Sequence, residues 1–142
     1  MNGDFNEYFA TVRTKYFTKE AKRRIILGTF ARMAGYRDAF YLKAMKVRTK
    51  IIDEYKKLFK KYDLLISPSM PNIAPKFKDI EKLSPLENYM MDIMTVGPNL
   101  AGLPHISIPS GMSKKLPTGM LVIANHFQEK KLINFARWLE SK

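Results

Sequence analysis

Residues 98–124 read PNLAGLPHISIPSGMSKKLPTGMLVIA, and this stretch decides the fold. Within it, residues 105–109 alternate between polar and apolar side chains and are bounded by prolines, a pattern typical of a β-strand. Residues 111–117 form a predicted turn with two lysines at its tip. Residues 119–124 are predicted to form a second strand, and because this strand is continuously apolar at its centre, both of its faces should be covered.

Helices and one further strand are predicted on both sides of this stretch. A strand over residues 64–67 ends at Pro68, and Pro71 and Pro75 then hold the chain extended, because each proline fixes its own φ. Apolar residues at helical spacing predict helices over residues 18–34, 38–62, 84–97 and 129–140. The resulting order, α-α-β-loop-α-β-β-α, is that of an α/β fold.

The helix over residues 38–62 has two distinct faces. Asp38 is a suitable N-cap for it, and Gly35 ends the helix before it, because glycine accepts the left-handed conformation. The predicted apolar stripe consists of Phe40, Ala44, Val47, Ile51, Tyr55 and Leu58. A different face carries Lys43, Lys46, Lys50, Lys57 and Lys61.

The sheet predicted for this chain is incomplete. Three short strands, at least one of them covered on both faces, imply a larger sheet than the chain supplies. Either the strands complete their sheet with another polypeptide, or the chain is part of a larger enzyme. We therefore treat residues 1–142 as a single partial domain, with a helical part over residues 1–62 and a strand and helix part over residues 63–142.

Charge is spread unevenly along the chain. The net charge is +12, and residues 1–62 hold 16 Lys and Arg against 6 Asp and Glu, whereas residues 63–142 hold 9 against 7. A basic half of this kind indicates either a polyanionic partner such as RNA or a solvated helical surface, and charge alone does not choose between them. The absence of cysteine, of an apolar run long enough to span a bilayer, and of a secretory signal predicts a cytoplasmic protein without a membrane partner.

Common catalytic motifs are missing from the sequence. No two glycines are adjacent, so no phosphate-binding loop is present, and Gly-x-Ser-x-Gly is absent. His105 and His126 are the only histidines, which argues against a metal site. No serine has a lysine at the spacing of a Ser–Lys dyad on one helix turn. The sequence therefore predicts no catalytic residue and no metal ligand in this chain.

Two charged residues lie beside or within apolar stretches of the sequence. Arg24 leads into the apolar run Ile25-Ile26-Leu27, and Asp92 lies within the apolar stretch of residues 89–94. A carboxylate in such surroundings is costly to bury unless a cation or hydrogen-bond donors hold it. A guanidinium binds an α-carboxylate in bidentate fashion, and a carboxylate accepts from an α-ammonium. Arg24 and Asp92 are therefore candidate substrate-binding residues for an amino-acid zwitterion, although composition alone favours a partly exposed salt bridge for each.

Several segments together resemble a known family. They are EAKRRIILGT at residues 20–29, AGYRDA at 34–39, KVRT at 46–49, DLLISP at 63–68, MDIMTV at 91–96, PNLAGLP at 98–104, ISIP at 106–109 and LPTG at 116–119. In this order they resemble the C-terminal third of the A subunits of aspartyl/glutamyl-tRNA amidotransferases, which are amidase-signature enzymes. The residues at 88–92 are most similar to archaeal forms.

The resemblance implies a fold, an activity and partners. It implies the C-terminal part of the amidase-signature fold, a mixed sheet flanked by helices. The implied glutaminase subunit hydrolyses glutamine and passes ammonia to a B-type subunit, which uses ATP and Mg to amidate mischarged glutamyl- or aspartyl-tRNA, and a C-type subunit completes the complex. The family's Ser-Ser-Lys catalytic residues lie upstream in an N-terminal half that this chain lacks, so the chain alone should not hydrolyse amides. By the same resemblance, the glutamine-holding arginine and aspartate fall on Arg24 and Asp92.

Three other interpretations remain open. The chain is also compatible with a fragment of a generic amidase, although Arg24 together with Asp92 favours an amino-acid amide over an aliphatic one. A basic RNA-binding module would use the lysine-rich helix of residues 43–61, but no aromatic residue lies on its lysine face for base stacking. A product of a decayed gene would be insoluble when expressed alone, because its sheet edges and apolar faces lack partners.

Overall fold

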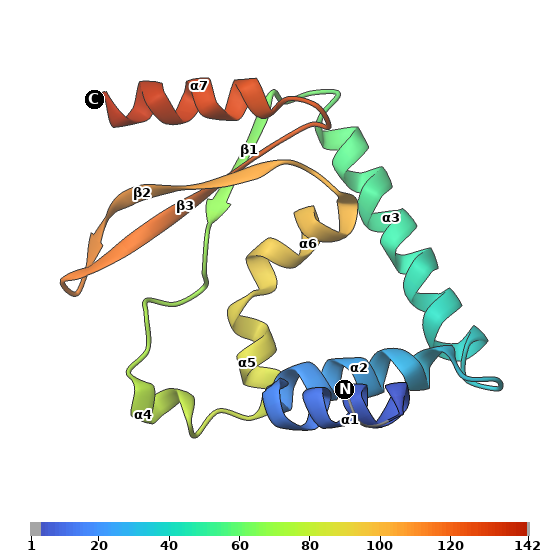
Figure 1. Cartoon of the computed structure of the whole chain (residues 1–142). Coiled ribbons are helices and arrows are strands. Elements are labelled where there is room, and N and C mark those ends of the chain that lie inside the picture. The colour runs from blue at the N-terminus through green and yellow to red at the C-terminus, as the bar shows by residue number, and fades with distance from the viewer. Residues whose placement is uncertain (1–3, 142) are drawn as a thin grey trace. The chain divides into compact units, whose positions relative to one another are not determined.

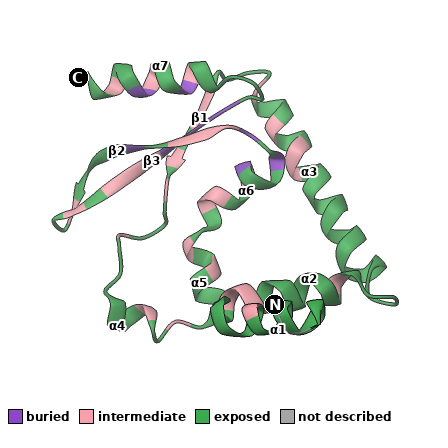
Figure 2. Cartoon of the chain, in the orientation of Figure 1, coloured by how far each residue is buried: buried purple, intermediate pink, exposed green. Residues whose placement is uncertain are grey.

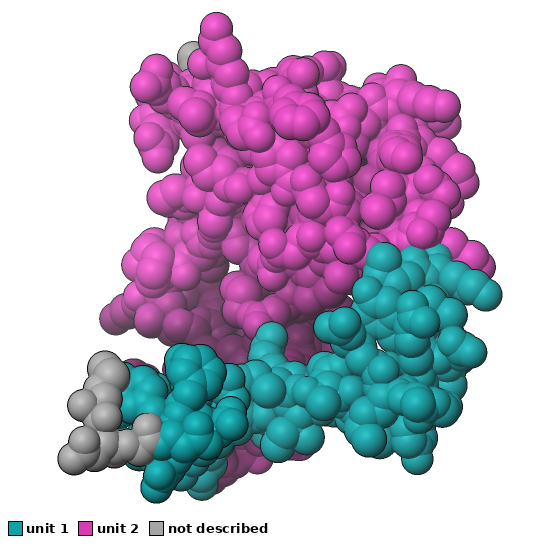
Figure 3. Space-filling model, turned by 45° about the vertical axis from the view of Figure 1, so that its right-hand side comes forward, with its two compact units in different colours: residues 1–46 teal, residues 47–142 magenta. Residues whose placement is uncertain are grey.

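A computed structural model describes residues 4–141 of the chain, which divides into two compact units, residues 1–46 and residues 47–142 (Figure 3). The charge-based division of the sequence at residue 62 stays a prediction, since it describes composition rather than packing. The elements in chain order are α1 (Phe5–Tyr16), α2 (Lys19–Arg32), the π-helical turn η1 (Asp38–Leu42), α3 (Lys43–Leu58), β1 (Leu64–Pro68), α4 (Phe77–Ile80), α5 (Pro85–Met91), α6 (Ile93–Ala101), β2 (His105–Ser113), β3 (Leu116–Ala124) and α7 (Glu129–Glu140) (Figure 1).

The first unit begins, within the described residues, with α1 and α2, of which the sequence predicted α2 and not α1. α2 begins after Thr18, whose hydroxyl accepts a hydrogen bond from the Ala21 amide at 3.2 Å, so the helix predicted over residues 18–34 is confirmed. α1 was not predicted. Its apolar residues are mostly aromatic, and aromatic side chains have lower helix propensity than Leu or Ala. Phe5 and Phe9 instead form a ring pair one turn apart, with centroids 4.5 Å from each other.

The end of the first unit differs from the prediction. Gly35 has a left-handed φ of +84°, but it does not end α2, because that helix ends at Arg32 and its C-cap Met33 is extended. Asp38 is not an N-cap, because it lies inside the helical turn η1, whose cap residue Arg37 already has helical dihedrals and makes no side-chain cap. Phe30, Tyr36 and Phe40 form an aromatic cluster here, with centroids between 4.5 and 6.1 Å apart. The connection between α2 and η1 is therefore held by the packing of these rings and not by a side-chain cap.

The second unit is built on a three-stranded sheet in which β3 is central. The order is β1-β3-β2, and both pairings are antiparallel, with Leu65 opposite Ile123 and Ser107 opposite Leu121. Leu121, Val122, Ile123 and Ala124 are all buried. The prediction that the apolar strand is covered on both faces is confirmed, because it has a strand on each edge and helices above and below. β1 is only partly buried, because it forms an edge of the sheet.

Two apolar clusters hold the helices to the faces of the sheet (Figure 2). On one face, Leu132 and Ala136 of α7 pack with Ile108, Val122 and Ala124. On the other face, Ala101 and Leu103 pack with Leu121 and Ile123, and Ile52, Tyr55 and Phe59 cover them.

The face of α3 that packs on the sheet is rotated from the predicted stripe. Ile52, Tyr55 and Phe59 make the contact, whereas Val47 and Leu58 are exposed. The predicted stripe was therefore partly wrong, because apolar residues occur on two neighbouring faces of this helix and spacing alone cannot choose between them.

The helix predicted over residues 84–97 is two helices. α5 ends at Met91, Asp92 has non-helical dihedrals, and α6 continues through Pro98 to Ala101. Proline was expected to end the helix, but Pro98 is fully buried, and its burial outweighs the local preference. The true end is Gly102, which has a left-handed φ of +69°.

A glycine sets the close approach of α6 to α3. A Cβ atom added at Gly97 would lie 2.7 Å from the Tyr55 hydroxyl oxygen and 3.5 Å from the nearest ring carbons. We expect Gly97→Ala to destabilise the chain by about 1–3 kcal/mol through overpacking, measured by urea unfolding. Adding Tyr55→Phe should recover most of the loss, because only ordinary contacts remain. A double variant no more stable than Gly97→Ala would contradict this packing.

Candidate functional site

Asp92 lies at the junction of α5 and α6, where its backbone is held firmly. Its carbonyl oxygen accepts hydrogen bonds from the Thr95 hydroxyl at 2.9 Å and the Thr95 amide at 3.0 Å. Although Asp92 is the N-cap of α6, its side chain makes no capping hydrogen bond. Within residues 4–141, no hydrogen bond or ion pair engages the carboxylate. A positioned carboxylate that does not serve its own helix is available to a ligand cation.

The structure corrects one premise for Asp92. The apolar stretch of residues 89–94 suggested a buried carboxylate, but Asp92 is exposed in this chain. The apolar residues around it fall on two short helices that turn at Asp92, so their side chains do not enclose it. Desolvation is therefore not an argument for a bound cation here.

Arg24 lies on the exposed surface of α2 beside a second arginine. Its Nε donates to Glu20 Oε1 at 2.9 Å, and Arg23 Nη1 lies 3.4 Å from Glu20 Oε2. Arg24, Gly28 and Arg32 follow one another at four-residue spacing and line an open hollow. Gly28 has no atom within 4 Å of an added Cβ, so the space between the two arginines is open.

Arg24 and Asp92 belong to different units, residues 1–46 and residues 47–142. Their joint role in holding a zwitterion stays a prediction.

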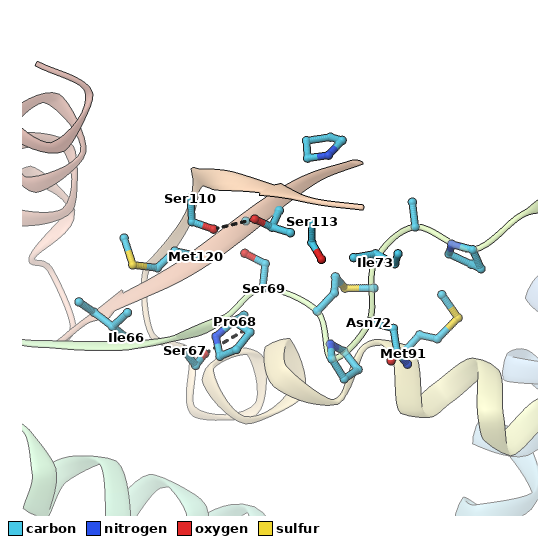
Figure 4. Close-up of a pocket in the computed structure, with 17 residues that line it drawn as sticks. Ile66, Ser67, Pro68, Ser69, Asn72, Ile73, Met91, Ser110, Ser113 and Met120 are labelled. Carbon is cyan, nitrogen blue, oxygen red and sulfur yellow. Dashed lines mark hydrogen bonds between the residues drawn. The ribbon is translucent and has the colours of Figure 1, made fainter. Parts of the chain in front are cut away.

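A large hollow opens beside the sheet in the second unit (Figure 4). Its volume is about 820 Å³, and the proline-rich loop after β1 forms one wall. Met91, the residue before Asp92, also lines the hollow, whereas Asp92 itself does not. Hydroxyl groups form a polar part of the wall, contributed by Ser67, Ser69, Ser110, Ser113 and Thr118.

Gly119 lets the hydroxyl of Ser107 on β2 and that of Ser69, the residue after β1, meet over the central strand. The Ser69 and Ser107 hydroxyl oxygens lie 2.7 Å apart and share a hydrogen bond. A Cβ at Gly119 would lie 2.8 Å from Ser107 Oγ and 2.9 Å from Ser69 Oγ, so a larger residue would break this bridge. Ser110 Oγ and Thr118 Oγ1 form a second hydroxyl pair at 3.2 Å. The sequence did not predict this grouping, because it depends on register across three strands; the signal that was available is the repeated serine at positions 67 and 69.

Within residues 4–141, both histidines and every serine except Ser113 have a hydrogen-bond partner. His105 Nδ1 lies 2.9 Å from the Leu103 carbonyl oxygen, and His126 Nε2 lies 3.1 Å from that of Ala101. Both rings therefore tie loops to the backbone. Between residues 4 and 141, no serine is hydrogen bonded to a lysine or histidine, and no cluster of three potential metal ligands occurs. No helix in that range is both long and apolar enough to cross a membrane.

A capping box holds α5, which leads to Asp92. Ser84 Oγ accepts from the Glu87 amide at 3.2 Å, and Glu87 Oε2 accepts from the Ser84 amide at 2.8 Å. Hydrogen bonding with Ser84 lowers the pKa of the Glu87 carboxyl. The backbone of Ser84 has the larger effect and its side chain the smaller.

The capping box predicts a pH dependence of stability. Because the folded-state pKa of Glu87 is lowered, its contribution is present above the unfolded-state pKa and is lost as pH falls through the folded-state pKa. We expect Glu87→Gln to remove this part of the acid sensitivity, measured as the melting temperature between roughly pH 3 and pH 6. Glu81→Gln, at an exposed glutamate outside the box, is the matched control. Equal acid sensitivity of the parent and the Glu87→Gln variant would contradict the assignment.

Comparison with known proteins identifies the family. The family model described as Amidase matches residues 2–133. The A subunit of the glutamyl-tRNA(Gln) amidotransferase of Archaeoglobus fulgidus is 51% identical over 135 residues, covering 95% of this chain and 29% of that protein. The corresponding A subunit of Thermoanaerobacter pseudethanolicus is 48% identical, covering 94% of this chain and 27% of that protein.

Solved structures agree with these matches. The A subunit of the glutamyl-tRNA(Gln) amidotransferase of Thermotoga maritima has a TM-score of 0.68 at 43% identity, covering 93% of this chain and 29% of that one. The allophanate hydrolase of Kluyveromyces lactis has a TM-score of 0.72 at 27% identity, covering 93% of this chain and 21% of that one.

The chain belongs to the amidase family, and the α/β fold and the resemblance predicted from the sequence are confirmed. Among amidases it is similar to the A subunits of glutamyl-tRNA(Gln) amidotransferases. It spans about 29% of the length of the Archaeoglobus relative and corresponds to a C-terminal piece of such a protein.

Proposed function

We propose that this chain is the C-terminal part of a glutaminase subunit that supplies ammonia for tRNA-dependent amidation. The observation that carries the proposal is the 51% identity to the Archaeoglobus fulgidus A subunit over 95% of the chain. Similarity at this level extends through both the α2 region and the α5–α6 junction, where the two candidate binding residues lie. The chain would contribute substrate binding, and the serine nucleophile would come from the rest of the same subunit.

The binding role follows from charge and position. Free glutamine carries an ammonium and a carboxylate on the same carbon. The exposed Asp92 carboxylate, which does not cap its own helix, would accept from the ammonium. Arg24, beside the open space at Gly28, would bind the carboxylate. Holding both ends of the α-carbon would orient the side-chain amide toward the nucleophile, and orientation of this kind lowers the barrier by proximity.

The remaining components of the reaction are proposals for the larger assembly. The N-terminal half of the glutaminase subunit would complete the amidase domain. A B-type subunit would use ATP and Mg to activate the carboxylate of a mischarged tRNA, and a C-type subunit would join the complex. No cofactor is assigned to this chain, and its proposed location is the cytoplasm.

A domain replacement tests the proposed function directly. The matched 135 residues of the Archaeoglobus protein would be exchanged for this chain, and the chimera would be assembled with the Archaeoglobus partner subunits. We expect glutamine-dependent amidation of mischarged tRNA. A chimera that assembles and accepts free ammonia but not glutamine would contradict the proposed role in glutamine use.

Substrate choice separates the alternatives. A generic amidase would hydrolyse propionamide as well as glutamine, whereas a site for a zwitterion would favour glutamine. A basic RNA-binding module would instead bind tRNA as an isolated chain, with affinity that falls steeply with salt. Against that module, two lysines of α3 are engaged by neighbouring acids, because Lys57 lies 2.7 Å from Glu54 and Lys56 lies 3.8 Å from Asp53.

A further inference from the structure

The hairpin between β2 and β3 has an unusual turn. Ser113 pairs with Leu116, so Lys114 and Lys115 alone form the loop. Both have positive φ, 50° and 65°, which is the geometry of a type I′ turn. This turn favours Asn-Gly, because a side chain in the left-handed region is disfavoured. Two consecutive lysines oppose the local preference, and such exceptions point to a role for the side chains.

The same two residues concentrate the charge of the hairpin. Between Asp92 and Glu129 they are the only residues with a formal charge at pH 7, with histidine counted as neutral. Both are exposed, and in the part of the chain that the structure describes neither forms an ion pair. Figure 1 shows the loop at the far end of the β2–β3 arm. The arm thus presents two unneutralised ammonium groups at its tip.

We propose that the Lys114–Lys115 tip contacts phosphate groups of the tRNA on which the amidotransferase acts, an inference that rests on the proposed function. Lysine offers a compact charge with three donors on a flexible stem, which suits phosphate oxygens at varied positions. Residues 63–142 hold only 9 Lys and Arg against 7 Asp and Glu, so the tip is a local concentration of positive charge in a nearly balanced part of the chain. The absence of acidic residues from the arm removes internal competition for the two ammonium groups.

The test replaces the lysines with the residues that the turn prefers. In the chimeric complex, Lys114→Asn with Lys115→Gly should leave the melting temperature unchanged or higher, while tRNA binds less tightly. Each phosphate contact contributes about 0.7–0.9 to the slope of log affinity against log salt, so the slope should fall by about 1.4–1.8. When the salt concentration rises fourfold, the affinity of both complexes for tRNA falls. The fold-decrease should be roughly seven to twelve times larger for the parent than for the variant.

Two controls make the outcome decisive. Lys78→Ala with Lys82→Ala removes the same charge elsewhere in the second unit and should leave the slope unchanged, and Lys114→Arg with Lys115→Arg should keep it. An unchanged slope in the Asn-Gly variant, or an equal fall in the Lys78/Lys82 variant, would overturn the inference. Binding is measured directly with mischarged tRNA, so a complex that binds through the tip but does not amidate would contradict the proposed function and not this contact.

Discussion

Replacing Asp92 by alanine in the chimeric amidotransferase is expected to lower kcat/KM for glutamine by roughly ten- to a thousandfold. This decrease corresponds to about 1.4–4 kcal/mol, the usual loss when one partner of a charged hydrogen bond is removed. Asp92 has a fixed backbone, an exposed carboxylate and no capping role, so the substitution should remove ligand binding with little effect on folding. Initial rates of glutamine hydrolysis at varied glutamine concentration would measure the effect.

Free ammonia separates a binding defect from a general one. Ammonia bypasses the glutaminase step, so amidation driven by ammonia should be the same in the Asp92→Ala complex and in the parent. Asp79→Ala, at an acidic residue of α4, is the matched control and should leave glutamine kinetics unchanged. If Asp92→Ala has normal glutamine kinetics, Asp92 is not the group that holds the ammonium.

The sequence predicted the sheet region better than its surroundings. Residues 105–124 carry alternation, a turn and an apolar strand, and β2 and β3 form there. The predicted turn over residues 111–117 was too long, because both strands extend into it and only Lys114 and Lys115 remain as the turn. Periodicity failed where tertiary contacts decide the outcome. Pro98 continues a helix because it is buried, and the packed face of α3 is chosen by the sheet beneath it. Neither effect is encoded in the local pattern.

The candidate site was predictable in its residue types and not in its geometry. Arg24 and Asp92 stand out in the sequence as charges beside apolar runs, but whether each is buried depends on where the helices turn. The hydroxyl bridge between Ser69 and Ser107 joins residues 38 positions apart, and it forms only because Gly119 lies between them. A sequence pattern does not carry contacts of that range.

Leu132→Ala is expected to destabilise the chain by about 2–5 kcal/mol. Leu132 is 4% exposed and lies in the cluster that joins α7 to the sheet. Its truncation leaves a cavity, because Val122 and Ile108 are held by the strands and cannot collapse into the space. Urea unfolding of the parent and the variant would measure the difference in the free energy of unfolding.

The neighbouring residue is a matched control that also tests whether the rest of an amidase domain covers this chain. Ile133 lies on the same helix and is 48% exposed. In the isolated chain, Ile133→Ala should lower the free energy of unfolding by less than about 0.5 kcal/mol. If the remainder of the domain packs on this face of α7, Ile133→Ala should lower the free energy of unfolding more in the chimera than in the isolated chain. The effect of Leu132→Ala should be similar in both. Equal costs for Leu132 and Ile133 in the isolated chain would contradict the placement of α7 on the sheet.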